Sequence, residues 1–163
     1  MSYGTTLTKS RESYTKAIDR KIWDTESCSE WLTSNHTLDK SAGGTVSGGD
    51  ASWKALSEEV YGPFSEYLHD PHLLIVWETT SGWEMIGVAT LYWNLKAPGD
   101  CTKTKDSTSK EWDGSSPAAF NFGFEKQSDG GIRIAKTASF ANSTKAIGEM
   151  LKRGMLKPED LTK

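Results

Sequence analysis

The spacing of apolar residues changes near residue 70, and this change constrains the fold more than any other feature of the sequence. Before it, apolar side chains recur every three or four residues, which is helical spacing. After it, apolar and polar residues alternate, which is typical of strands with one buried face. Helices followed by strands predict an α+β fold. A chain of 163 residues is expected to form one domain, over residues 1–163.

Three helical segments are expected before residue 70, and a short strand or arm lies among them. The helices are one over residues 9–23, a short one that carries Cys28, Trp31 and Leu32, and one that begins at Asp50 and ends at Pro63 with a last turn over residues 64–68. The arm covers residues 35–40. On the first helix, Tyr14, Ala17, Ile18 and Ile22 share one apolar face.

Two hairpins are expected in the second half of the chain. Their strands cover residues 72–79, 83–95, 118–125 and 132–140. The polar residues 96–116 form an insertion that we expect to be a long exposed loop. A helix over residues 144–153 begins a C-terminal extension, residues 144–163. His69 and His72 flank Asp70-Pro71 in an expected loop, and their spacing is no metal signature.

The longest expected strand is apolar on both faces. Gly87, Ala89, Leu91 and Trp93 lie on one side of it, and Val88 lies on the other. Since helices cover only one face of such a sheet, a second copy of the chain is the simplest cover for the other. We therefore expect a homo-oligomer, with a dimer as the first choice.

Charge and composition exclude several classes of function. The net charge is −3 without a cluster of basic residues, so we expect no nucleic-acid partner. No stretch has the roughly 18 apolar residues of a membrane span. Cys28 and Cys101 are expected to be free thiols of a cytoplasmic protein, and we expect neither a metal nor another cofactor.

The order of these segments resembles the nuclear-transport-factor-2-like superfamily over roughly residues 8–143. The segments that carry the resemblance are Ile18-Asp19-Arg20-Lys21-Ile22-Trp23-Asp24, Ser52-Trp53-Lys54-Ala55-Leu56, Ser128-Asp129-Gly130-Gly131-Ile132 and Ala138-Ser139-Phe140-Ala141-Asn142. The superfamily includes ketosteroid isomerases, scytalone dehydratases, limonene epoxide hydrolases and SnoaL-like cyclases. The resemblance implies a cone-shaped fold, with helices packed in a strongly curved and mostly antiparallel sheet.

The resemblance also implies a function: a cofactor-independent isomerase, cyclase or dehydratase that acts on a small hydrophobic intermediate. Small fungal members are the most similar, and they imply a polyketide, terpenoid or alkaloid of secondary metabolism. Asp19 resembles the first-helix aspartate of scytalone dehydratases. Lys40 falls in the arm where ketosteroid isomerases carry their base and scytalone dehydratases carry a tyrosine.

Acid–base catalysis needs a proton donor and a proton acceptor in a dry cavity. The candidates are Asp19, Lys40, His36 and Asn121, the last as an amide that would orient a carbonyl. Asn121 lies on the strand face opposite the three phenylalanines at positions 120, 122 and 124, and we favour the arrangement that turns Asn121 inward. The alternative turns the phenylalanines inward and leaves Asn121 outside.

The candidate residues for binding a small-molecule substrate are Tyr14, Ala89, Leu91, Trp93 and Lys136. Trp93 is the favoured aromatic wall, because Gly87 and Ala89 on the same face leave room beside it. Two alternatives to the isomerase or dehydratase remain. One is a non-catalytic module that binds a small molecule or dimerises, and the other is a hydrolase of epoxides or lactones.

Overall fold

A computed structural model of the chain describes residues 14–162. Its centre is a six-stranded sheet with the order β2-β1-β8-β7-β4-β3. The strands are β1 (Leu32–Asp39), β2 (Thr45–Ser47), β3 (Phe64–Glu78), β4 (Gly82–Leu95), β7 (Gly114–Lys126) and β8 (Ile132–Ala141). All neighbouring pairs are antiparallel except β1 and β8, which are parallel. This is the α+β cone architecture that the sequence predicts.

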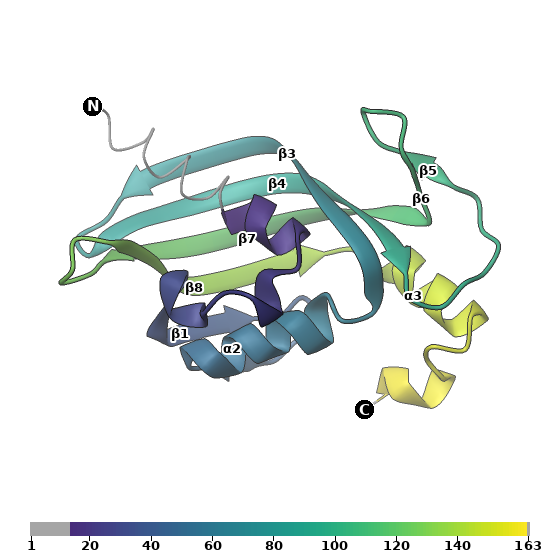
Figure 1. Ribbon diagram of the computed structural model, residues 1–163, viewed down its shortest axis with the longest axis horizontal. Coiled ribbons are helices and arrows are strands. Elements are labelled where there is room, and N and C mark those ends of the chain that lie inside the picture. Colours follow the sequence, from purple (N-terminus) through teal and green to yellow (C-terminus); the bar gives the residue numbers. More distant parts are fainter. Residues whose placement is uncertain (1–13, 163) are drawn as a thin grey trace.

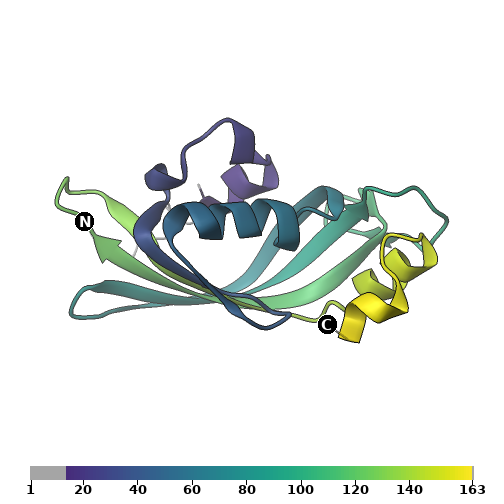
Figure 2. The same ribbon diagram turned by 90° about the horizontal axis from the view of Figure 1, so that it is seen from below.

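The sheet is strongly curved, and the N-terminal helices lie on its concave face (Figures 1 and 2). They are a helix at residues 14–19, the 3₁₀-helices η1 (Ile22–Asp24) and η2 (Cys28–Glu30), and α2 (Gly49–Ala55), which continues into the π-helix η3 (Leu56–Val60). No element described for residues 14–162 covers the opposite face (Figure 2).

The predicted apolar face of the first helix is confirmed, because Tyr14, Ala17, Ile18 and Ile22 are all at least 95% buried. The C-terminal end of the predicted helix, at residue 23, lies too far along the chain. The α-helix ends at Asp19, the N–H groups of Arg20 and Lys21 bond three residues back in a tighter turn, and Lys21 adopts a left-handed conformation with φ 57°. There the Lys21 ammonium donates to the carbonyl oxygens of Phe64 and Ser65, which ties the end of the helix to the start of β3.

Three further boundaries differ from the expectations. Cys28 lies in the short helix η2, but Leu32 already begins β1. Residues 64–68, expected to be a helical turn, pair with β4 as the first part of β3. This strand also runs through Asp70-Pro71, which was expected to be a loop. Because β3 is an edge strand, a proline without an N–H group is tolerated there, and a bulge follows it.

The region 96–116, expected to be a loop, holds some regular structure. It contains a small two-stranded sheet, formed by β5 (Thr104–Lys105) and β6 (Glu111–Trp112), and β7 already begins at Gly114. The expected C-terminal helix is confirmed as α3 (Thr144–Lys152), and the 3₁₀-helix η4 (Pro158–Thr162) follows it. α3 lies at one end of the sheet (Figure 1).

Candidate functional site

The inner face of the sheet and the first helix enclose a cavity of about 90 Å³. Its wall is mostly apolar. The lining residues are Tyr14, Thr15, Ile18, Leu38, Ser41, Leu56, Val60, Tyr61, His69, Leu91, Ala118, Ala119, Phe120, Phe122, Thr137, Ser139 and Ala141. An engineered apolar cavity of 150 Å³ holds one benzene ring, so a ligand with a six-membered ring must widen this cavity or extend beyond it.

One ionisable pair lies at the wall of this cavity. Nδ1 of His69 is 2.6 Å from Oδ1 of Asp19, and the backbone N–H of His69 points at both carboxylate oxygens at 3.3 Å. The two side chains are only 11% and 14% exposed. An aspartate that accepts from Nδ1–H fixes the tautomer of the imidazole and leaves the lone pair of Nε2 available. Asp19 thus fixes the orientation of the His69 ring.

Tyr61 completes the group, because its hydroxyl lies 3.0 Å from Nε2 of His69. With the imidazole proton on Nδ1, the phenol donates this hydrogen bond. Burial first, and then the charges of Tyr14, Tyr67 and Asp19, raise the pKa of Tyr61 well above its usual value. Tyr61 is therefore a neutral phenol at pH 7, able to donate a proton but a poor base.

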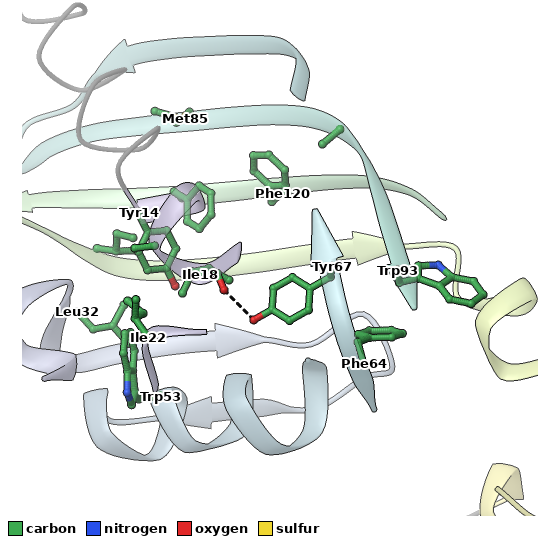
Figure 3. Packing of buried hydrophobic residues seen from close by; sticks show 14 of the residues in the cluster. Tyr14, Ile18, Ile22, Leu32, Trp53, Phe64, Tyr67, Met85, Trp93 and Phe120 are labelled. Atoms are coloured by element: carbon green, nitrogen blue, oxygen red, sulfur yellow. Dashed lines mark hydrogen bonds between the residues drawn. The ribbon is translucent and has the colours of Figure 1, made fainter. Parts of the chain in front are cut away.

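The local chain geometry explains how these three side chains meet. Asp19 is the last residue of the first helix, and the hydroxyl of Tyr67 donates to the carbonyl oxygen of Ile18 at 2.8 Å (Figure 3). His69 follows two residues later on β3, so it projects from the same face as Tyr67. Tyr61 comes directly after the π-helix η3, and its ring stacks on Trp23 and Tyr67. Single turns of π-helix are frequent at functional sites.

Three of the predicted site residues are at the cavity. Tyr14 and Leu91 line it, and Asp19 holds its histidine. Ala89 and Trp93 lie on the inner face, as expected, but in the packed core outside the cavity lining. The expected room beside Gly87 is filled by a neighbouring ring, because a Cβ on Gly87 would lie 2.2 Å from Cε2 of Phe120.

The prediction that Asn121 points inward is wrong. Phe120, Phe122 and Phe124 occupy the inner face and are more than 90% buried. Strand alternation then places Asn121 on the outer face, where its amide donates to Glu84 at 2.9 Å. Burying three aromatic rings outweighs burying one amide.

The two predicted lysines are also outside the cavity. Lys40 lies just beyond β1, in the turn before β2, and its ammonium pairs with Glu59 at 2.6 Å. Lys136 projects from the outer face of β8, where it is exposed and 3.9 Å from Asp39. Long cationic side chains keep their charged ends in water unless a buried partner holds them.

His36 differs from both its expected roles. It is fully buried on β1, and it does not line the cavity. Nε2 of His36 lies 3.0 Å from Oγ1 of Thr137, which does line it. His36 therefore contacts the cavity wall from behind.

Sequence reasoning missed His69 and Tyr61. The Asp70-Pro71 pair predicted a loop, so His69 was read as a loop residue. A weaker signal was present: Tyr67 and His69 are two residues apart in a run rich in aromatic residues, which is the spacing of one strand face.

Within the described part of the chain, no group of three or more His, Cys, Asp or Glu side chains is arranged to hold a metal ion. Cys28 and Cys101 are free thiols, as expected. None of the helices described for residues 14–162 is both long and apolar enough to cross a membrane.

No protein-family model matches the sequence, and neither does any curated protein. Solved structures do resemble the fold. A Salmonella enterica protein of the nuclear transport factor 2-like superfamily aligns with a TM-score of 0.66 and 11% identity, over 89% of this chain and 94% of its own. The hexachlorocyclohexane dehydrochlorinase LinA-type3 of Novosphingobium barchaimii aligns with a TM-score of 0.62 and 14% identity, over 83% and 84%.

A third similar structure is a candidate dehydratase of the same family from Streptomyces avermitilis. It aligns with a TM-score of 0.65 and 11% identity, over 83% of this chain and 94% of its own. Identities this low establish a shared fold and not a shared reaction. The chain has the nuclear-transport-factor-2-like fold.

Proposed function

We propose that this protein is a small-molecule lyase in which His69 removes a proton from a carbon atom of the substrate. One observation carries the proposal: Nδ1 of His69 is 2.6 Å from the Asp19 carboxylate, and the ring lines an apolar cavity. An imidazole oriented by a carboxylate is a general base, and the carboxylate stabilises the imidazolium that forms. The dry wall strengthens that interaction.

The proposed reaction is an elimination. Nε2 accepts the proton, the C–H electron pair becomes the new C=C bond, and the leaving group on the adjacent carbon departs with its own electron pair. If hydroxide leaves, the phenol of Tyr61 gives it a proton, and the imidazolium returns a proton to the phenolate. Because the Tyr61 hydroxyl bonds Nε2 of His69, this hydrogen bond must break before a substrate C–H can approach Nε2.

The apolar cavity wall favours a compact hydrophobic substrate. We propose a polyketide-, terpenoid- or alkaloid-like intermediate of secondary metabolism. Two proteins of the same fold support the reaction type, because one is a dehydrochlorinase and the other a candidate dehydratase. Isomerisation and cyclisation begin with the same proton removal, and they remain alternatives when no leaving group is present. Hydrolysis of an epoxide or lactone would instead use the base to activate water.

The test is a turnover screen with ring-sized compounds that carry a leaving group next to an acidic C–H, such as β-hydroxyketones and chlorinated cyclohexanes. His69→Gln should lower the rate of any observed elimination by about 10²–10⁴-fold, the range expected for a general base. His72→Gln is the matched control, because this exposed histidine lies on the same strand and bonds Thr90 instead.

Two results would contradict the proposal. Equal turnover by the wild-type protein and by His69→Gln would remove His69 as the base. Absence of turnover across the screen, with the compounds bound in the cavity, would favour the non-catalytic binding module.

We also propose that the uncovered face of the sheet binds a second copy of the chain. Its exposed apolar side chains are Leu73, Ile75, Trp77, Ile86, Val88 and Phe140, each 37–63% exposed. They lie on β3, β4 and β8. Leu73 pairs with Val88 across β3 and β4, and Ala119 of the intervening strand β7 pairs with both Val88 and Phe140, so the patch is continuous. Six such side chains offer on the order of 500 Å², most of the roughly 800 Å² that each partner of a standard interface buries.

A further inference from the structure

The buried histidine behind the cavity wall has one hydrogen-bond partner. His36 is 0% exposed, and its Nε2 lies 3.0 Å from Oγ1 of Thr137. Thr137 is itself 5% exposed and lines the cavity. The other ring nitrogen, Nδ1 of His36, is buried without a partner among the described residues. The Thr137 hydroxyl thus lies between His36 and any ligand in the cavity.

The unpartnered nitrogen decides which way this hydrogen bond runs. Burial lowers the pKa of His36 to about 4, so the ring is neutral at pH 7 and carries a single N–H. A proton on Nδ1 would leave a buried donor unpaired, which is costly. A proton on Nε2 leaves only a lone pair unpaired, and it lets Nε2–H donate to Thr137. The second tautomer is favoured.

The consequence concerns the proton of the Thr137 hydroxyl. Since Oγ1 accepts from His36, its O–H must point elsewhere, and no described residue accepts it. Several other polar groups of the wall are already committed: Ser41 donates to Ser139, Ser139 lies within 3.4 Å of the Asp39 carbonyl oxygen, and Tyr61 bonds His69.

We propose that His36 is a positioning residue that holds the Thr137 hydroxyl as a hydrogen-bond donor to an oxygen atom of the ligand. The inference rests on the proposed function only in taking this cavity as the substrate site. It narrows the substrate class to compact molecules that carry a carbonyl or hydroxyl oxygen. A ligand without an acceptor would leave the Thr137 proton buried and unpaired, and a site of this kind discriminates strongly against such a ligand.

Two probes of nearly equal shape test this proposal, cyclohexanone and methylenecyclohexane, because only the ketone has an acceptor. Their dissociation constants are measured by titration of ¹H–¹⁵N correlation spectra. Replacing Thr137 by valine removes the hydroxyl and keeps the shape, so the preference for the ketone should fall about five- to tenfold, the value of one hydrogen bond. Thr137→Ser should retain it. Methylenecyclohexane should bind Thr137→Val at least as tightly as the wild-type protein, because no hydroxyl is then left unpaired, and this binding shows an intact cavity.

The role of His36 is tested in the same assay. His36→Gln keeps an N–H donor near the position of Nε2 and should retain the preference, whereas His36→Leu should lose it to the same extent as Thr137→Val. The ¹⁵N spectrum of the wild-type imidazole should show a proton on Nε2 of His36. A proton on Nδ1, an unchanged preference in Thr137→Val, or failure of cyclohexanone to bind the wild-type protein would each overturn the proposal.

These measurements need no turnover, so they separate this inference from the proposed function. The preference for the ketone should persist in His69→Gln. If the turnover screen fails but Thr137→Val still loses the preference, the lyase proposal fails and the hydrogen-bond donor stands. If elimination depends on His69 but Thr137→Val keeps the preference for the ketone, the lyase proposal stands and the hydrogen-bond donor fails.

Discussion

The stability of this protein should depend on pH through His36. Burial lowers the pKa of this histidine from 6.5 to about 4 in the folded state. The unfolded chain exposes the imidazole, which then takes up a proton near pH 6.5. Because the unfolded state binds a proton that the folded state does not, the free energy of unfolding falls as the pH falls through this window.

The size of the effect follows from the width of the window. Each pH unit between the two pKa values removes about 1.4 kcal/mol, so the whole window is worth about 3 kcal/mol. Between pH 7 and pH 5, His36 alone should lower the free energy of unfolding by about 2 kcal/mol. That is a large share of the total for a domain whose stability is of the order of 5–15 kcal/mol.

Urea denaturation at pH 7, 6 and 5 measures this loss in the wild-type protein and in His36→Gln. His69, His72 and the carboxyl groups are present in both proteins, so the difference between the two pH profiles isolates His36. The wild-type protein should lose about 2 kcal/mol more than the variant over this range. Parallel profiles would show that the folded protein protonates His36 freely, and they would refute the argument from burial.

Two further predictions concern packing. Gly114→Ala should destabilise the fold by about 1–3 kcal/mol, because the new Cβ would lie 2.5 Å from the buried Trp93 ring. Gly148→Ala, inside α3 with open space around it, should stabilise the fold by about 0.5–1 kcal/mol. Urea denaturation measures both, and equal changes in the free energy of unfolding would contradict the packing argument. In light scattering after size exclusion, the protein should have twice the 18.0 kDa mass of one chain. Phe140→Glu should reduce it to one chain, whereas Leu161→Glu, exposed outside the patch, should not; a wild-type monomer at tens of micromolar would end the dimer proposal.

The elements of the fold were predictable where one local signal dominated. Alternation over residues 118–125 and the Ser128-Asp129-Gly130-Gly131 turn predict β7 and β8 correctly. Alternation cannot say which face is inside when both faces carry apolar or amide side chains, and Asn121 was placed wrongly for that reason. The face is set by the three phenylalanine rings packing against Tyr14 and the rest of the core, which is a long-range effect.

The candidate site was less predictable, because it combines residues from three separate segments. Asp19 was found through its resemblance to the first-helix aspartate of scytalone dehydratases. His69 was not, because the Asp70-Pro71 signal for a turn was overridden by pairing of β3 with β4 at the edge of the sheet. Tyr61 depends on the π-helix η3, whose extra residue per turn changes the direction of the side chain, and no local sequence pattern predicts such a turn.

The two buried histidines differ in how well each could hold a proton taken from a substrate. His36 and His69 are both shielded from water, and burial by itself disfavours the charged imidazolium. Among the described residues, His36 has only the Thr137 hydroxyl as a hydrogen-bond partner, so no charge offsets that cost and the ring stays neutral. His69 has the Asp19 carboxylate at 2.6 Å, so an imidazolium formed by proton abstraction would be paired at once. A base must be able to hold the proton that it takes, and of these two rings His69 alone has a carboxylate placed to stabilise that charge.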